Sequence, residues 1–191
     1  MTGPTGRITT GLVAQGVIGL RYLCLTVLLV GAVGLAGRFL AWPLLTSTVG
    51  PTAYVFAAHP RAEVSRFRNA LIGHGVAIGA GLGALTAFGL RHHPSVTAAG
   101  GPSYRQVAAA AVAVGVTLLV LEVARSHHAP AAATALLITT GLAMPGRPLG
   151  GLVLGLAIVI VLGPVLGRWP FGRAESSAHP SDDGLRGAAR S

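Results

Sequence analysis

Two short apolar stretches, each with a proline at or near its start, decide how this sequence folds. They are VGPTAYVFAA at residues 49–58 and APAAATALLI at residues 129–138. Each lies between two longer apolar stretches, and neither has the ~20 residues that a helix needs to cross a bilayer. Non-helical backbone at membrane depth persists only where protein buries it or where it lines a watery cavity. Two interrupted segments at matching places in a chain are typical of a transport site between two halves of a membrane protein.

The composition as a whole is that of an integral membrane protein. Only 10% of the 191 residues are charged, against about 25% in soluble domains, and the mean hydropathy is +0.68. The net charge of +9 comes from arginine alone. The arginines lie in loops and tails with few aromatic residues among them, so we predict no nucleic-acid partner. We interpret them as determinants of membrane orientation.

The pattern predicts an all-α membrane protein with about six hydrophobic segments, four long and two short and proline-led. Their expected bounds, good to about 2–4 residues, are 22–40, 46–58, 69–90, 106–124, 129–144 and 149–166. A cytoplasmic or interfacial segment is expected at 1–20, with no regular structure in 1–10. A transmembrane domain is expected at 21–167 and a disordered cytoplasmic tail at 168–191.

The arginines also bear on whether the short segments cross the membrane or enter and leave by the same face. If all six segments cross and the N-terminus lies inside, 10 of the 14 arginines are cytoplasmic. If the short segments re-enter, more arginines fall outside. The positive-inside rule therefore predicts six crossings in a cell membrane, with both termini cytoplasmic.

The two halves of the chain share one order of segments: long, short with a leading proline, long. Pro51 and Pro130 are 79 positions apart, and so are Arg68 and Arg147. Three crossings in each half would turn the second half upside down relative to the first. The sequence thus predicts a 3+3 inverted repeat.

Glycines recur at helical spacing on two of the long segments. Gly75, Gly79 and Gly83 share one face of the third segment, and Gly151 and Gly155 share a face of the sixth. Faces of small residues allow helix backbones to approach closely in lipid. Close helix packing is the expectation, and the high glycine content of the chain, 28 residues, is the alternative explanation.

The two leading prolines favour helix starts at the short segments. Proline is well tolerated in the first turn, where backbone N–H groups have no intrahelical partner. The free N–H groups behind Pro51 and Pro130, together with the helix dipole, would attract an anion. We expect Pro51, Thr52, Pro130 and Thr134 to meet in one cavity or close interface. The alternative is a loop that enters an ordinary short helix at the membrane surface.

Four other residues near these segments are candidates for contact with an anion: Arg68, Asn69, His74 and His128. Arginine binds a planar oxyanion through two parallel hydrogen bonds. An unperturbed histidine titrates near pH 6.5, so His128 would make uptake pH-dependent. For His74 the alternative is an interior histidine that is hydrogen-bonded for structural reasons.

Catalysis and cofactor binding are not indicated. His127 and His128 are adjacent and do not share a helix face, and no cysteine or acidic cluster completes a metal-ligand set. The chain has no GxSxG, HExxH or P-loop pattern. We therefore predict no metal, no cofactor and no enzymatic activity. For Glu122, near the end of the fourth segment, the expectation is snorkelling to the membrane surface or a local pair with Arg125.

Residues 128–136, HAPAAATAL, resemble the block HPPAGATAL that names the HPP family of integral membrane proteins. Ala129 and Ala132 replace the middle proline and the glycine of that block. The pairs Arg68-Asn69 and Gly73-His74 resemble an upstream block of the same family. The resemblance covers roughly residues 20–167. Some members are associated with nitrite transport, so the resemblance implies a small-anion transporter.

Two functions of different classes follow from these observations. The first is a transporter or channel for a small anion such as nitrite. Its partners would be the lipid bilayer, a small inorganic anion and further copies of the chain in a homo-oligomer. The second is a non-transporting scaffold or accessory subunit. Alternating access to a central site favours the first, and a stable partner without an aqueous cavity favours the second.

Overall fold

The computed structural model describes the backbone of residues 4–168 and the side chains of residues 13–168. In that range it contains helices and no strand, which confirms the all-α fold and the six predicted segments. The helices are α1 (Pro4–Leu40), α2 (Val49–Ala58), α3 (Phe67–Ala87), α4 (Tyr104–Val123), α5 (Ala131–Thr139) and α6 (Arg147–Gly167), with a 3₁₀ turn η1 (Glu63–Ser65). The tail predicted beyond residue 168 lies outside the described residues.

The first helix begins earlier than predicted. Residues 4–10 were expected to lack regular structure, but they belong to α1, which starts at Pro4. A proline at this end is compatible with a helix because its missing N–H removes no intrahelical bond. Tyr22–Trp169 forms one compact unit.

Four helices are long and apolar enough to cross a membrane: α1 over Val13–Leu40, α3, α4 and α6. Large apolar side chains such as Leu119, Val153 and Val165 are exposed on their outer surfaces. Such surfaces are costly in water and suit contact with lipid tails. The chain is therefore a multi-pass membrane protein.

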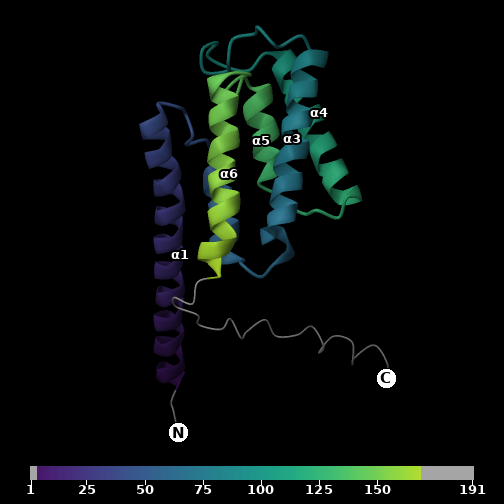
Figure 1. Ribbon diagram of the computed structural model, residues 1–191. Coiled ribbons are helices and arrows are strands. Elements are labelled where there is room, and N and C mark those ends of the chain that lie inside the picture. The colour runs from purple at the N-terminus through teal and green to yellow at the C-terminus, as the bar shows by residue number, and fades with distance from the viewer. Residues whose placement is uncertain (1–3, 169–191) are drawn as a thin grey trace, which may run out of the picture. The chain divides into compact units, whose positions relative to one another are not determined.

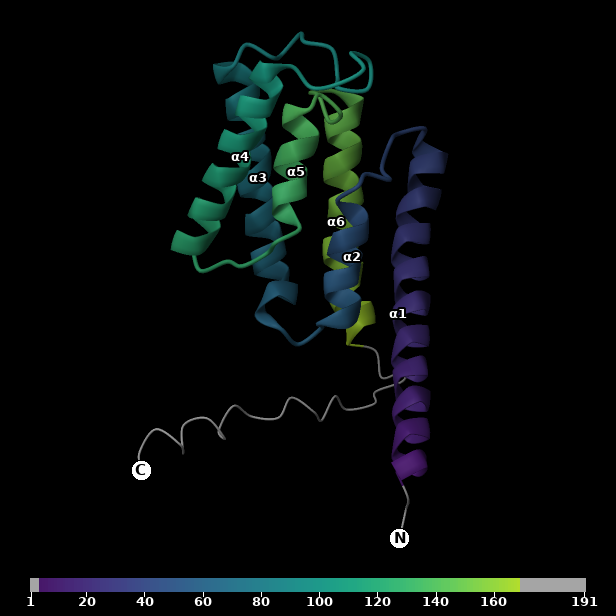
Figure 2. The ribbon, with the colours of Figure 1, turned by 180° about the vertical axis from the view of Figure 1, so that it is seen from behind.

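Each short helix lies beside the last helix of the other half of the chain. α2 packs on α6, and α5 packs on α3. Within each pair the two helices run parallel to each other (Figures 1 and 2). α2 lies along the C-terminal half of α6, where Phe56 faces Gly163 and Gly167. The irregular stretch 41–48 lies along the N-terminal half of α6, where Trp42 contacts Gly150. Non-helical backbone thus supplies the length that α2 lacks, as predicted.

Successive helices of this unit point alternately up and down in Figure 1. The stretches 59–66 and 124–130 therefore lie at one end of the bundle, and 88–103 and 140–146 lie at the other. The chain traverses the bundle along α2 and along α5 and does not double back. This path is compatible with six crossings, and the number of crossings stays a prediction.

Glycines on α6 allow backbone to pack directly against the helix. A Cβ atom added at Gly151 would lie 2.5 Å from the Pro43 carbonyl oxygen, and one at Gly155 would lie 2.5 Å from the Leu44 carbonyl oxygen. Carbon atoms do not approach an oxygen so closely, so only glycine allows the 41–48 stretch to lie here. The predicted packing role of Gly151 and Gly155 is confirmed.

The predicted packing face on α3 is wrong within this chain. A Cβ atom added at Gly75, Gly79 or Gly83 would meet nothing within 4 Å. The glycines of α3 that receive another helix are Gly73, beside His128 and Ala131, and Gly81, beside Ile138. Spacing alone could not distinguish these two faces because both carry small residues.

Equivalent packing positions in the two halves are separated by 82 residues. Gly81 receives Ile138 of α5, and Gly163 receives Phe56 of α2. The two glycines are 82 positions apart, and so are the two side chains that they receive. The offset of 79 between the leading prolines is not the one at which the packing positions match. These correspondences favour an inverted repeat, and the repeat itself stays a prediction.

Candidate functional site

A threonine in each short helix contacts the same histidine of α3. Thr52 is the fourth residue of α2 and Thr134 is the fourth residue of α5, and they too are 82 positions apart. His74 Nε2 lies 3.3 Å from Thr52 Oγ1, and His74 Nδ1 lies 2.8 Å from Thr134 Oγ1. The N-terminal ends of the two short helices therefore meet on the two nitrogens of one ring.

His128, in the stretch that leads into α5, is the fourth member of this cluster. Its Nε2 lies 3.2 Å from His74 Nε2, and its Nδ1 lies 2.9 Å from the carbonyl oxygen of Val64. The two imidazole rings are 4.9 Å apart and T-shaped. Phe56 of α2 lies beside His128, with ring centroids 6.4 Å apart. We call Thr52, His74, His128 and Thr134 the Thr–His cluster.

Two backbone carbonyls, those of Val64 and Thr48, fix the direction of every hydrogen bond in the neutral cluster. The Val64 carbonyl only accepts, so His128 carries its hydrogen on Nδ1 and presents a lone pair at Nε2. His74 must then donate from Nε2 and accept at Nδ1 from the Thr134 hydroxyl. The opposite tautomer of His74 would place two lone pairs face to face across 3.2 Å. Thr52 donates to the Thr48 carbonyl, so its oxygen can share, as a second acceptor, the hydrogen that His74 Nε2 donates to His128.

A glycine and the turn around η1 position His128. A Cβ atom added at Gly73 would lie 3.1 Å from His128 Cβ, so the absence of a side chain there allows the histidine to approach α3. The Val64 carbonyl is presented by the turn around η1. Ser65 holds that turn by donating to the carbonyls of Val55 and His59. The 59–66 stretch therefore sets the tautomer of His128.

The cluster is sealed from solvent and contains no fixed charge. The four side chains are 0–3% exposed, and no Asp, Glu, Lys or Arg is buried among the residues whose side chains are described. The four groups satisfy one another, so burial leaves none of them without a partner. The arrangement can donate hydrogen bonds, accept them and take up a proton without competition from a nearby carboxylate.

The structure brings some of the predicted site residues together and leaves others apart. Thr52, His74, His128 and Thr134 form the cluster, and Pro130 is the buried N-cap of α5 beside it. Their role in binding stays a prediction.

Three predicted site residues lie outside the cluster. Pro51 and Arg68 are exposed. Asn69 is buried, and it donates to the carbonyl of Glu63, so it holds the turn around η1 rather than reaching the histidines. Asn69 thus acts on the same turn that presents the Val64 carbonyl.

The expectation of free backbone N–H groups at the start of α5 is wrong. The N–H groups of Ala131, Ala132 and Ala133 donate to the carbonyls of residues 128–130. Tight turns at the start of the helix use these donors. The groups at this helix end that would bind a ligand are therefore side chains, not backbone.

Sequence reasoning missed the Val64 carbonyl and Phe56. A main-chain oxygen leaves no mark in the sequence, and Phe56 looked like any other apolar residue of a short helix. The pair expected for Glu122 also differs. Glu122 Oε2 lies 3.6 Å from His127 Nδ1 on the exposed surface, so His127 faces away from the cluster.

A metal site has little support in the described residues. His74 and His128 bring two ring nitrogens together, but no group of three His, Cys, Asp or Glu side chains is found there. A structural or catalytic zinc site uses three or four such ligands. The hydrogen that His74 places on Nε2 also occupies the position that a metal would need.

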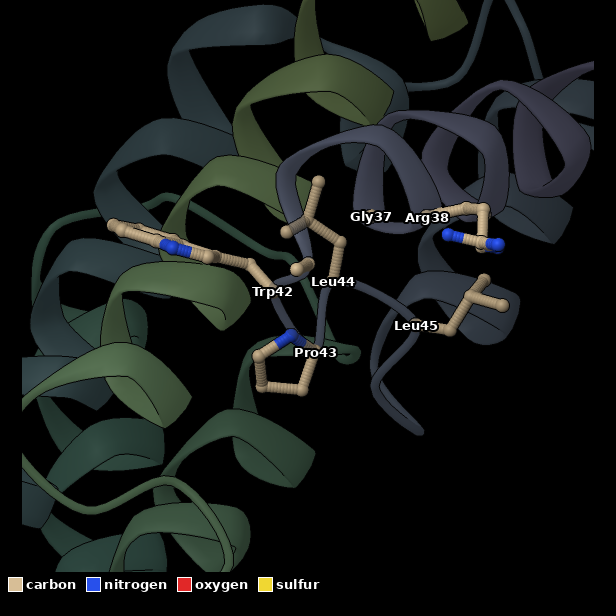
Figure 3. Close-up of a pocket in the computed structure, with 8 residues that line it drawn as sticks. Gly37, Arg38, Trp42, Pro43, Leu44 and Leu45 are labelled. Atoms are coloured by element: carbon tan, nitrogen blue, oxygen red, sulfur yellow. The ribbon is translucent and has the colours of Figure 1, made fainter.

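An open groove of about 390 Å³ lies at the C-terminal end of α1. Its lining residues include Arg38, Trp42, Leu44 and Leu45 (Figure 3). The indole of Trp42 extends toward α6, where it contacts Gly150. The groove is separate from the Thr–His cluster, and both Arg38 and Trp42 are exposed.

One comparison with known proteins gives a match. The family model described as HPP, transmembrane region, matches residues 14–170 of this chain. This range includes the whole Thr–His cluster. No curated protein and no solved structure matches the chain.

Proposed function

Because the chain belongs to the HPP transmembrane family, we propose that it is a transporter or channel for a small inorganic anion such as nitrite. The observation that carries the proposal is the Thr–His cluster. Two short helices, one from each half of the chain, bring their N-terminal ends to one buried group of donors. Interrupted helices that meet within a membrane domain are the usual setting of a transport site.

The chemistry of the cluster suits an anion. Hydroxyl O–H and imidazole N–H groups are donors to an oxyanion. Among the described side chains, no carboxylate is buried near them to repel a negative ligand. An anion would bind by replacing bonds that the four side chains make with one another, so the sealed cluster corresponds to a closed state. The choice of nitrite rests on the resemblance noted in the sequence.

Membrane orientation belongs to the same proposal. The arginine distribution supports a cell membrane with both termini in the cytoplasm, since 59–66 and 124–130, which lie at one end of the bundle, carry Arg61, Arg66 and Arg125. A homo-oligomer and the absence of enzymatic activity also stay predictions.

Anion flux into proteoliposomes tests the proposal. The purified chain should carry nitrite faster than protein-free liposomes do, and nitrate, formate and chloride would define its selectivity. Thr52→Val removes a hydroxyl without a change of volume. A hydrogen bond to a charged group contributes about 1.5–3 kcal/mol, so this variant should bind the anion roughly 10- to 100-fold more weakly. The control is Thr86→Val, whose hydroxyl is exposed and bonds only within α3. Equal flux in all three chains would contradict the proposal.

The alternative of a non-transporting scaffold has one observation in its favour. Every polar side chain of the Thr–His cluster already has a partner within the chain, which is also the pattern of a structural lock between helices. Such a lock predicts that Thr52→Val lowers stability while nitrite flux is absent from the unaltered chain as well.

A further inference from the structure

The hydrogen bonds of the Thr–His cluster determine where an additional proton can bind. In the neutral cluster, His128 Nδ1 is held by the Val64 carbonyl and His128 Nε2 accepts from His74. His74 Nδ1 accepts from the Thr134 hydroxyl. A hydroxyl rotates about its C–O bond and can accept as well as donate. His74 Nδ1 is therefore the one ring nitrogen that gains a proton through the rotation of a single hydroxyl, with no movement of the backbone.

A second proton is strongly disfavoured by the same geometry. It would have to reside at His128 Nε2, which would then point an N–H at the N–H of His74 across 3.2 Å. Two positive charges at this separation repel strongly away from water. The pair therefore holds either no extra proton or one.

An anion at this site needs a positive charge to balance it, and no side chain near the two rings in the described part of the chain carries one. The elements packed around the two rings face them with neutral groups: Thr52 and Phe56 from α2, Thr134 from α5, and the Val64 carbonyl. Charged side chains of the adjoining stretches, such as Glu63, Arg66 and Glu122, lie on the surface. A buried ion without a partner is very costly. A proton on His74 would offset the charge of the anion, and the anion would offset the charge of the proton.

We propose that the His74–His128 pair takes up one proton with each anion, so that the two cross the membrane together as an electrically neutral unit. The proposal rests on the proposed anion transport. The incoming proton binds His74 Nδ1, which then donates to Thr134 Oγ1, and the Thr134 hydroxyl turns its hydrogen to the anion. Release reverses both steps, so one proton and one anion leave together and the neutral cluster is restored. Because each ligand strengthens binding of the other by the same factor, the coupling works in both directions.

Three measurements on the full chain in proteoliposomes test the proposal. A pH dye inside the vesicles should report one proton for each nitrate or nitrite taken up. A membrane potential set with potassium and valinomycin should leave the initial rate unchanged, since a neutral unit carries no charge. Far above the pH at which the pair is half-protonated, the rate should rise about tenfold for each unit by which pH falls, as expected for one bound proton. Protein-free liposomes measure leakage of the undissociated acid.

The outcomes separate this proposal from the proposed function. Anion flux that follows the membrane potential and moves no protons would overturn the coupling while anion transport stands. No flux of nitrite, nitrate, formate or chloride above protein-free liposomes would overturn both.

Variants locate the proton. His74→Gln keeps a polar side chain that cannot become a cation, and it should abolish proton movement with the anion. The matched control is His127→Gln, because His127 is exposed in the same stretch as His128 and should behave as the unaltered chain does. Thr134→Ser keeps the hydroxyl and should keep the coupling. Proton movement that persists in His74→Gln would assign the proton to another group and overturn the proposal.

Discussion

Loss of the Thr134 hydroxyl should destabilise the protein far more than loss of an exposed threonine hydroxyl on another helix. Thr134→Val is nearly isosteric, so it creates no cavity. It leaves His74 Nδ1, which accepts from Thr134 at 2.8 Å, without its donor in a side chain that is only 3% exposed. The perturbation is therefore confined to one unsatisfied buried acceptor.

The structure sets the size of this effect. An unsatisfied buried acceptor costs about 1–3 kcal/mol. For a chain of 150–250 residues each kcal/mol corresponds to about 2–4 °C in the unfolding midpoint, so Thr134→Val should lower the midpoint by roughly 2–12 °C. Thr134→Ser retains the hydroxyl and should recover most of the loss. Thr86→Val, in which an exposed hydroxyl on α3 is lost, should change stability by no more than about 0.5 kcal/mol.

Thermal unfolding of the purified proteins in detergent, followed by the loss of the monodisperse peak in size-exclusion chromatography, compares these variants. The Ser variant controls for backbone effects at the position, and the Thr86 variant controls for threonine removal in a helix. If Thr134→Val and Thr86→Val unfold at the same temperature, His74 does not depend on Thr134 and the hydrogen-bond directions assigned to the cluster are wrong.

Two other predictions follow from packing and topology. Gly155→Ala places a methyl group 2.5 Å from a backbone oxygen that cannot move aside, so it should destabilise the protein by about 1–3 kcal/mol, whereas Gly79→Ala meets open space and should unfold no earlier than the unaltered chain. Unfolding in detergent compares the two, and an equal loss in both would contradict the observed packing of α6. In a Cys24→Ser chain, cysteines introduced as Arg61→Cys and His92→Cys should react with an impermeant thiol reagent from opposite faces of the membrane, with position 61 cytoplasmic. Reaction of both from one face would contradict the path of the chain through the bundle.

Much of the fold could be predicted from the sequence because lipid imposes few solutions. Apolar length alone marked the six helices, and the prolines marked where two of them start. Which face of a helix packs inward was harder. Gly73 and Gly81 receive α5 while Gly75, Gly79 and Gly83 face outward. The difference depends on which partner helix comes near, and glycine spacing contains no information about that.

The residues of the candidate site could likewise be predicted only in part. Thr52, His74, His128 and Thr134 were identified by their position near interrupted helices, and they do meet. Arg68 was included because arginine suits an oxyanion, but a residue one position into α3 lies at the end of the bundle and is exposed. Chemical suitability was visible in the sequence, whereas depth along the helix decided which groups are near one another.

The cluster also explains why one histidine is sufficient for two related helix ends. Thr52 and Thr134 occupy equivalent positions, so a symmetric protein would give each its own partner. The position 82 residues after His74 is Leu156, an apolar residue, and His74 serves both threonines through its two ring nitrogens. The two nitrogens are not equivalent in the neutral ring, since one donates and the other accepts. A single proton makes both of them donors, so Thr52 of α2 and Thr134 of α5 then each face an N–H group of the same ring. Under the proposed transport, protonation would make His74 a donor to α2 and to α5 alike without any movement of the backbone.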